Sequence, residues 1–244
     1  VLVTLWQVVG TWRAASLYCQ THAPRWLVWW GRVTQVVLVL IVFQGCIGLY
    51  NGGKQINHMA KLALGRDGLW THVARDDGAI AISGFITFET PPQLDALLVQ
   101  PDAPRRIRLD SPGGYVGPAK TLRETVTRLG LETEAVERCE SACTLIFANG
   151  ATRRAWLGTS FGFHGFTLPG IARTYLAAEE ELIKQSWRAR GIDGTFVDHA
   201  FAASGDAMWH PSLSELVAAK FVTHVVVDGQ AMDAPHYCQA NDCR

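Results

Sequence analysis

The chain begins with a strongly apolar segment and then changes to short alternating and helical patterns. Residues 33–50 contain no charged side chain. As a helix they would be roughly 27 Å long at about 1.5 Å per residue, close to the thickness of a bilayer core. Residues 1–32 hold three arginines and no acidic residue, and the stretch from Trp26 to Trp30 is rich in tryptophan. The pattern predicts a cytoplasmic segment over 1–32 and a transmembrane helix over 33–50.

The apolar segment has other interpretations, which stay open. One is a cleaved secretory signal, although 32 residues ahead of the apolar core is long for such a signal. Another is a lipoprotein cleavage site at Gly45-Cys46, although Phe43-Gln44 ahead of it is a poor match. A third is a buried core helix. Three basic residues between positions 54 and 66 also oppose the proposed orientation.

Behind the apolar segment the pattern is that of a mixed domain. Residues 51–78 have mixed polarity and five glycines, and are predicted to form a juxtamembrane linker. Residues 106–110 alternate as a strand does, and residues 118–129 carry apolar side chains at helical spacing. A second strand is expected over 133–137, followed by a buried helix over 142–149. Strands that alternate with helices predict the α/β class.

The later elements complete this domain. Residues 174–190 read as an amphipathic helix, and a helix over 213–220 is expected to lead into a strand over 221–225. This domain is therefore predicted to span 79–228. Residues 229–244 are predicted to form a polar C-terminal tail.

Three short motifs in the domain carry the parts of a hydrolytic site. Ser111-Pro-Gly-Gly114 ends the first strand, and its glycines let the backbone turn and expose N–H groups. Ser141 precedes an apolar helix, so its hydroxyl would lie at a helix N-terminus, where negative charge is favoured. His164 follows 23 residues later. Oxyanion donors, a nucleophile and a base indicate a serine hydrolase.

In this order and spacing, residues 79–226 resemble the Clp protease proteolytic subunit, within the wider ClpP/crotonase superfamily. That family has a strand ending in Ser-Pro-Gly-Gly, then a serine, then a helix end nine residues after the serine, as from Ser141 to Gly150 here. The resemblance implies an α/β fold built as a repeated ββα spiral, here behind an N-terminal transmembrane helix. It also implies oxyanion donors at the N–H groups of Gly114 and Ala142.

The chain also departs from the Clp subunit. Cys139 and Glu140 stand before the serine in place of the usual small pair, and the core is shorter. The pattern is closer to that of predicted periplasmic, membrane-anchored relatives. By the same resemblance, the triad acid is an aspartate before the last helix and strand. Asp206 is the nearest match, with about two extra residues between it and the strand, and Asp193 and Asp198 are alternatives.

Simpler roles remain for the same residues. Ser141 could be a helix N-cap and His164 a satisfied core histidine. A Ser–Lys pair with Lys120 or Lys184 is a further alternative, as in the related signal peptide peptidases. The three possible pairings of Cys139, Cys143, Cys238 and Cys243 stay open. A zinc site at His236, Cys238 and Cys243 lacks the usual close pairs of ligands.

Composition fits one catalytic domain and excludes one class of partner. Removing 50 residues from 244 leaves 194, enough for a single domain with a full core. Removing three arginines from 22 basic residues leaves 19 against 22 acidic, a net charge of −3 for the remainder. Such a surface does not indicate nucleic-acid binding.

The sequence therefore predicts a membrane-anchored serine protease or peptidase with its catalytic domain outside the cytoplasm. The reaction needs a peptide or protein substrate and no metal or cofactor, and the resemblance implies a homo-oligomer. Two other functions stay open. One is a non-catalytic binding module on the same fold, and the other is crotonase-type acyl-CoA chemistry.

Overall fold

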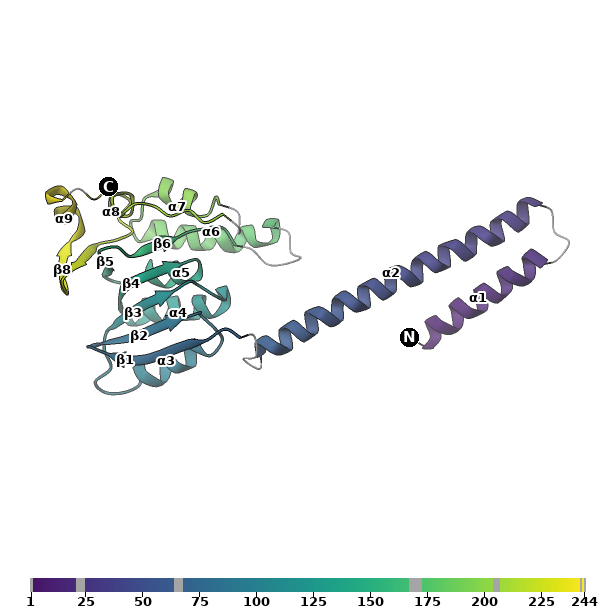
Figure 1. The fold of residues 1–244 in the computed structure, drawn as a ribbon, viewed down its shortest axis with the longest axis horizontal. Helices are drawn as coiled ribbons and strands as arrows, with labels where there is room; N and C mark the ends of the chain where they lie inside the picture. The colour runs from purple at the N-terminus through teal and green to yellow at the C-terminus, as the bar shows by residue number, and fades with distance from the viewer. Residues whose placement is uncertain are drawn as a thin grey trace. The chain divides into compact units, whose positions relative to one another are not determined.

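A computed structural model describes residues 2–20, 25–63, 68–166, 173–203, 207–241 and 243 (Figure 1). The chain divides into two units, Val1–Asp67 and Gly68–Arg244. Each unit is described by itself.

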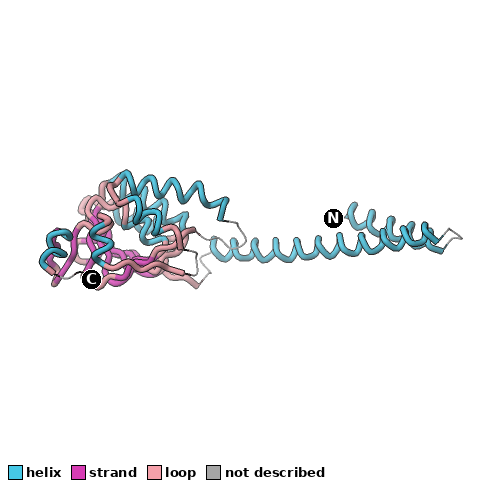
Figure 2. Tube along the Cα trace, turned by 90° about the horizontal axis from the view of Figure 1, so that it is seen from above, coloured by secondary structure: helices cyan, strands magenta, loops and turns pink. Residues whose placement is uncertain are grey.

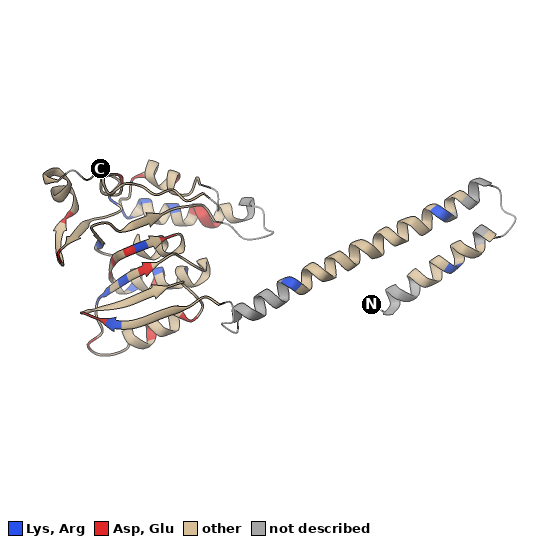
Figure 3. Cartoon of the chain, viewed as in Figure 1, with Lys and Arg blue, Asp and Glu red and all other residues tan. Residues whose placement is uncertain are grey.

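The N-terminal unit is a pair of helices. Helix α1 (Leu2–Gln20) runs back alongside the first half of α2 (Arg25–Ala63), and the Gln35 side-chain amide donates to Ser16 Oγ at 2.9 Å (Figures 1 and 2). Within α2, Arg32–Lys54 has a mean hydropathy of 2.0 and no buried side chain. Its 23 residues are long and apolar enough to cross a membrane. Figure 3 shows this stretch without charged side chains between its ends.

The second unit is built on one eight-stranded sheet, in which the described order is β1-β2-β3-β4-β5-β7-β8, with β6 beside β4. The pairs among strands β2 to β7 are all parallel. At the two edges, β1 pairs antiparallel with β2, and β8 pairs antiparallel with β7. The strands are β1 Thr71–Asp76, β2 Ala79–Gly84, β3 Arg106–Ser111, β4 Glu132–Glu140, β5 Arg153–Trp156, β6 Ser160–Gly162, β7 His224–Val227 and β8 Gln230–Asp233.

The helices of this unit lie mainly on one side of the sheet, as Figure 2 shows. They are α3 Thr90–Leu98, α4 Val116–Leu129, α5 Ala142–Phe147, α6 Arg173–Ala189, α7 Gly194–Ala200, α8 Leu213–Ala218 and α9 Ala234–Ala240. Helix α5 is buried along its whole length. It packs among aromatic rings: Phe147 lies 4.9 Å from Phe161 and 5.3 Å from Phe221, measured between ring centroids. The helix that follows Ser141 therefore stands in the centre of the core.

The opposite face of the sheet carries charge. Arg108 lies between Asp76 (2.6 Å) and Glu134 (2.8 Å), while Arg106 reaches Glu134 at 3.3 Å. The strand alternation explains this face, because Ile107 and Leu109 point into the core and leave the arginines on the other side. Only 4% of the Glu134 side chain is exposed, so its charge needs both arginine partners.

The structure refines the ends of the domain. Strand β1 pairs with β2 along its whole length, so the sheet begins within the segment that the sequence analysis assigned to the linker. At the other end, the expected tail contains β8 and α9, with Ala234 fully buried and a disulfide between Cys238 and Cys243. These two cysteines are therefore bonded to each other and not available as zinc ligands.

Candidate active site

Ser141 stands on the turn between β4 and α5, in a backbone conformation that L-residues rarely adopt. Its φ is +50° and its ψ is −122°. Conformations of this kind cost on the order of 1–3 kcal/mol and persist where the surroundings impose them. Here Ser141 N–H donates to Gly162 O at 2.8 Å, and Ser141 O accepts from Thr144 N–H at 3.0 Å and from Thr144 Oγ1 at 2.7 Å. Hydrogen bonds on both sides of Ser141 thus fix the turn, and the Ser141 side chain points away from the axis of α5.

The Ser141 hydroxyl is bonded to His164 and not to the helix. Ser141 Oγ lies 2.7 Å from His164 Nε2, and the side chain makes no cap hydrogen bond to α5. Ser141 thus occupies the N-cap position of α5, but its side chain does not cap the helix. His164 Nδ1 lies 2.7 Å from Gly165 O, which can only accept. The proton of a neutral ring is thus assigned to Nδ1, and Nε2 is free to accept from the serine hydroxyl.

Two glycines bring the end of β3 against this turn. Gly113 and Gly114 have φ of +102° and +145°, and a Cβ on Gly113 would lie 2.8 Å from Ser141 Cβ. A Cβ on Gly114 would lie 2.3 Å from Ile86 O. Ile86 N–H donates to Gly113 O and Tyr115 N–H donates to Ile86 O, so the alternation of a parallel bridge turns the N–H of Gly114 away from Ile86.

Gly114 and Ala142, whose N–H groups the family resemblance implies as oxyanion donors, both line the pocket that holds Ser141 and His164. Ala142 is the first residue of α5, and the first N–H groups of a helix have no partner within the helix. The structure thus brings together four of the five predicted site residues. The roles of these residues stay predictions.

A disulfide encloses the serine. Cys139 at the end of β4 and Cys143 in the first turn of α5 are bonded, with their Cα atoms 5.2 Å apart, and both are fully buried. The residue two positions before Ser141 and the residue two positions after it are thus covalently linked across the turn. The structure settles the pairing that the sequence left open: Cys139 with Cys143, and Cys238 with Cys243.

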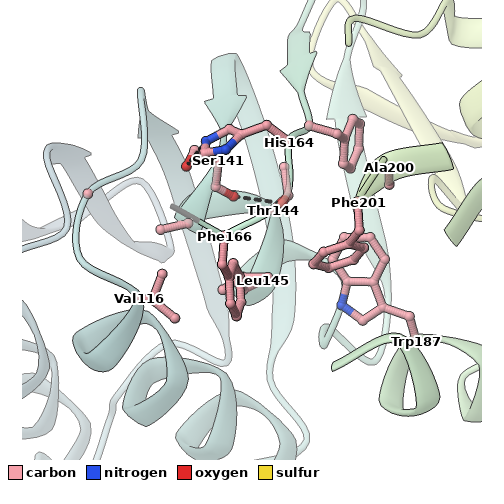
Figure 4. A pocket seen from close by; sticks show the side chains of 12 residues that line it. Val116, Ser141, Thr144, Leu145, His164, Phe166, Trp187, Ala200 and Phe201 are labelled. Atoms are coloured by element: carbon pink, nitrogen blue, oxygen red, sulfur yellow. Dashed lines mark hydrogen bonds between the residues drawn. The ribbon is translucent and has the colours of Figure 1, made fainter. Parts of the chain in front are cut away.

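The pocket beside Ser141 has a volume of about 140 Å³ (Figure 4). Its lining apart from Ser141, Thr144 and His164 is apolar: Gly114, Val116, Ala142, Leu145, Phe163, Phe166, Trp187, Ala200 and Phe201. In Figure 4, Ser141 and His164 lie at one side of this space, with Leu145 in the middle and Trp187 and Phe201 opposite. A substrate group that enters the pocket would meet these apolar side chains as well as the polar groups of Ser141, Thr144 and His164.

The predicted triad acid, Asp206, lies outside the described residues. The two alternatives are engaged elsewhere: Asp193 caps α7 by accepting from Phe196 N–H at 2.9 Å, and Asp198 pairs with Arg188 at 2.6 Å. Asp193 and Asp198 are therefore poor choices for an acid that orients His164.

The lysines proposed for a Ser–Lys pair are also engaged elsewhere. Lys120 pairs with Glu179 at 2.7 Å, and Lys184 lies 3.6 Å from Asp198. His164 is the basic group that reaches Ser141 Oγ. Among the residues that the structure describes, no group of three or more His, Cys, Asp or Glu side chains is placed to hold a metal ion.

Comparison with known proteins adds the fold. ClpP1 from Listeria monocytogenes superposes with a TM-score of 0.52, covering 62% of this chain and 92% of its own, at 17% identity. The fold is ClpP-like. This confirms the predicted fold class, in which an N-terminal apolar helix precedes a mixed α/β unit.

Two further structures cover the same share of this chain. The membrane-bound stomatin-specific protease 1510-N, as a serine-to-alanine mutant, is 20% identical with a TM-score of 0.49 and 78% of its own chain covered. A mutant of the Listeria ClpP1 is 16% identical with a TM-score of 0.49 and 91% covered. No family model and no curated protein matches the chain. At these identities the likeness gives the fold, and the chemistry has to come from the site.

Sequence reasoning missed the groups that surround His164. Gly165 O holds the imidazole, and Glu180 of α6 accepts from the next N–H group, that of Phe166, at 2.5 Å. Glu180 is 6% exposed, although its neighbours Glu179 and Glu181 form ion pairs whose side chains are only partly buried. The one available signal was its position on the apolar side of an amphipathic helix, where a glutamate needs a partner.

Proposed function

We propose that this chain is a serine peptidase that hydrolyses peptide bonds of a protein or peptide substrate. Ser141 Oγ attacks the carbonyl carbon, and His164 Nε2 takes the hydroxyl proton and returns it to the leaving amine. The N–H groups of Gly114 and Ala142 donate to the oxygen of the tetrahedral intermediate. A water molecule, activated by His164, then attacks the acyl-enzyme and releases the acid product and free Ser141. The resemblance to the Clp subunit implies Asp206 as the third member of the triad, and that assignment stays a prediction.

The observation that carries the proposal is the 2.7 Å contact between Ser141 Oγ and His164 Nε2. The Ser141 hydroxyl lies on a strained turn. The His164 ring is protonated at Nδ1, which leaves Nε2 to accept a proton as a general base requires. A core histidine or a capping serine requires neither. A crotonase-type acyl-CoA enzyme uses the oxyanion donors alone, so it gives no reason for this pair.

The apolar pocket supports a preference for substrates with an uncharged side chain beside the scissile bond. Apart from His164, the described lining residues have side chains that carry no charge, so a charged substrate side chain would lose hydration without an ion-pair partner. The substrate class is therefore a polypeptide with an apolar residue at the cleavage position.

We also propose that α2 anchors the enzyme in a membrane with Gly68–Arg244 outside the cytoplasm. Two disulfides in this unit support an oxidising compartment, since such bonds are rare in the cytosol. The positive, acid-free N-terminal flank supports the same side. ClpP-like proteins also lead us to propose a homo-oligomer, which the molar mass of the detergent-solubilised protein would test.

The proposed activity is tested with a fluorophosphonate probe and the full chain in detergent. Labelling should occur in the wild type and be lost in Ser141→Ala and His164→Ala, with peptide hydrolysis lost in both variants. Members of a catalytic group act as a unit, so His164→Ala should be nearly as damaging as Ser141→Ala. Thermal unfolding of Ser141→Ala should change little, because its hydroxyl does not cap α5. A folded wild type that is neither labelled nor active would favour a binding module on the same fold.

A further inference from the structure

The peptide group between Gly165 and Phe166 is hydrogen-bonded on both of its sides. Its carbonyl oxygen, Gly165 O, accepts from His164 Nδ1 at 2.7 Å. Its N–H, on Phe166, donates to Glu180 Oε1 at 2.5 Å. Carboxylate, peptide and imidazole thus form one chain of hydrogen bonds that ends at Ser141 Oγ, 2.7 Å beyond Nε2.

We propose that Glu180 is a positioning residue that stabilises the charged form of His164 through this one peptide group. The proposal rests on the proposed peptidase function and adds a carboxylate that acts on the imidazole without touching it. In a trans peptide the C=O and N–H point in opposite directions, so the carboxylate lies on one side of the peptide and the ring on the other.

Electrostatics explains why the chain of bonds favours catalysis. A negative charge at the N–H end polarises the peptide group and makes its carbonyl oxygen a stronger acceptor. When His164 takes the proton of Ser141, the ring becomes positive and Nδ1–H becomes a stronger donor. The interaction therefore strengthens in the transition state, which is the condition for an effect on rate. Glu180 is 6% exposed, so water screens this interaction little.

The surroundings keep the peptide group in place. Gly165 N–H donates to Ala203 O at 2.9 Å. Phe163, two residues earlier, exchanges both backbone hydrogen bonds with Trp209, at 2.9 and 2.8 Å. The Phe166 ring, whose residue is 8% exposed, lies 6.0 Å from that of Phe201. The segment that carries His164 is thus fixed on both sides, and Glu180 reaches it from a separate element, α6.

The test is Glu180→Gln, which keeps an oxygen acceptor for Phe166 N–H and removes the charge. Hydrogen bonds to charged groups exceed neutral ones in strength, so we expect kcat to fall about tenfold with KM changed less than twofold. The rate of fluorophosphonate labelling should fall by the same factor. Glu181→Gln is the matched control, because it makes the same charge change one residue further along α6 and should leave both rates unchanged.

A kcat for Glu180→Gln within threefold of the wild type would overturn the proposal, as would an equal loss in Glu181→Gln. The failure of the proposed function is distinguishable, since wild type would then not label at Ser141. If Glu180→Gln does not fold, proton NMR of Asp206→Asn decides. The low-field resonance of His164 Nδ1–H should persist there, because its acceptor is Gly165 O. Its disappearance would instead identify Asp206 as the partner.

Discussion

Removing the disulfide around Ser141 should lower both the stability and the activity of the enzyme. The perturbation is the double variant Cys139→Ala/Cys143→Ala. The bond closes a ring of only five residues, since the cysteines are four positions apart. For a ring of that size the loop-closure term is about 2 kcal/mol, which for a domain of this size lowers Tm by about 4–8 °C.

The effect on activity follows from the backbone of Ser141. Its positive φ costs on the order of 1–3 kcal/mol. The disulfide joins β4 to α5, the two elements between which Ser141 is held in this conformation. Without the bond, part of this strain can relax and move Oγ away from His164. A relaxation of about 1.4 kcal/mol would leave roughly a tenth of the molecules with the active geometry. We therefore expect kcat to fall about tenfold, with KM little changed.

The assay is steady-state hydrolysis of one peptide substrate, together with the rate of fluorophosphonate labelling and thermal unfolding. The matched control is Cys238→Ala/Cys243→Ala, which opens a ring of six residues in the C-terminal segment, while the pocket is lined from other parts of the chain. The control should lose similar stability and keep its kcat. If the first variant stays within twofold of wild-type kcat, or if both variants lose activity equally, the hydrogen bonds alone hold the turn and the reasoning is refuted.

Three further predictions follow from the same structure. For topology, an alkaline phosphatase fused at Arg244 should be active and a reporter that fluoresces only in the cytoplasm should stay dark; the opposite pair of results would reverse the orientation of α2. For the acid, Asp206→Asn should lower kcat by less than threefold, because His164 Nδ1 donates to Gly165 O; a loss on the order of 10⁴ would instead show that Asp206 holds the imidazole. Asp193→Asn and Asp198→Asn should change kcat little in either case, because Asp193 caps α7 and Asp198 pairs with Arg188. For the pocket, Ala200→Leu should reduce kcat/KM for substrates with large apolar side chains at the cleavage position more than for those with alanine there; equal losses would show that the substrate side chain does not enter this space.

Much of the fold and the elements that carry Gly114, Ser141 and His164 were predictable from the sequence, because the signals of these elements are local. An apolar run without charge makes α2 a candidate membrane helix whatever surrounds it. The alternation of β3, the glycines after it and the apolar run of α5 each specify their own element over a few residues. The resemblance to the Clp subunit predicted that Gly114, Ser141 and His164 would meet, and they do so because parallel strands end at one edge of the sheet.

Tertiary structure decided the partners of these residues. The sequence allowed three cysteine pairings. Only the structure shows that the Cα atoms of Cys139 and Cys143 lie 5.2 Å apart, close enough for a disulfide. The expected tail became β8 because its backbone groups find partners along the exposed edge of β7. Glu180 looked like one of three consecutive glutamates, and only the packing of α6 buries it and points it at Phe166 N–H. Helical spacing places Glu180 on the apolar side of α6, but the sequence does not show which group it contacts sixteen residues away from His164.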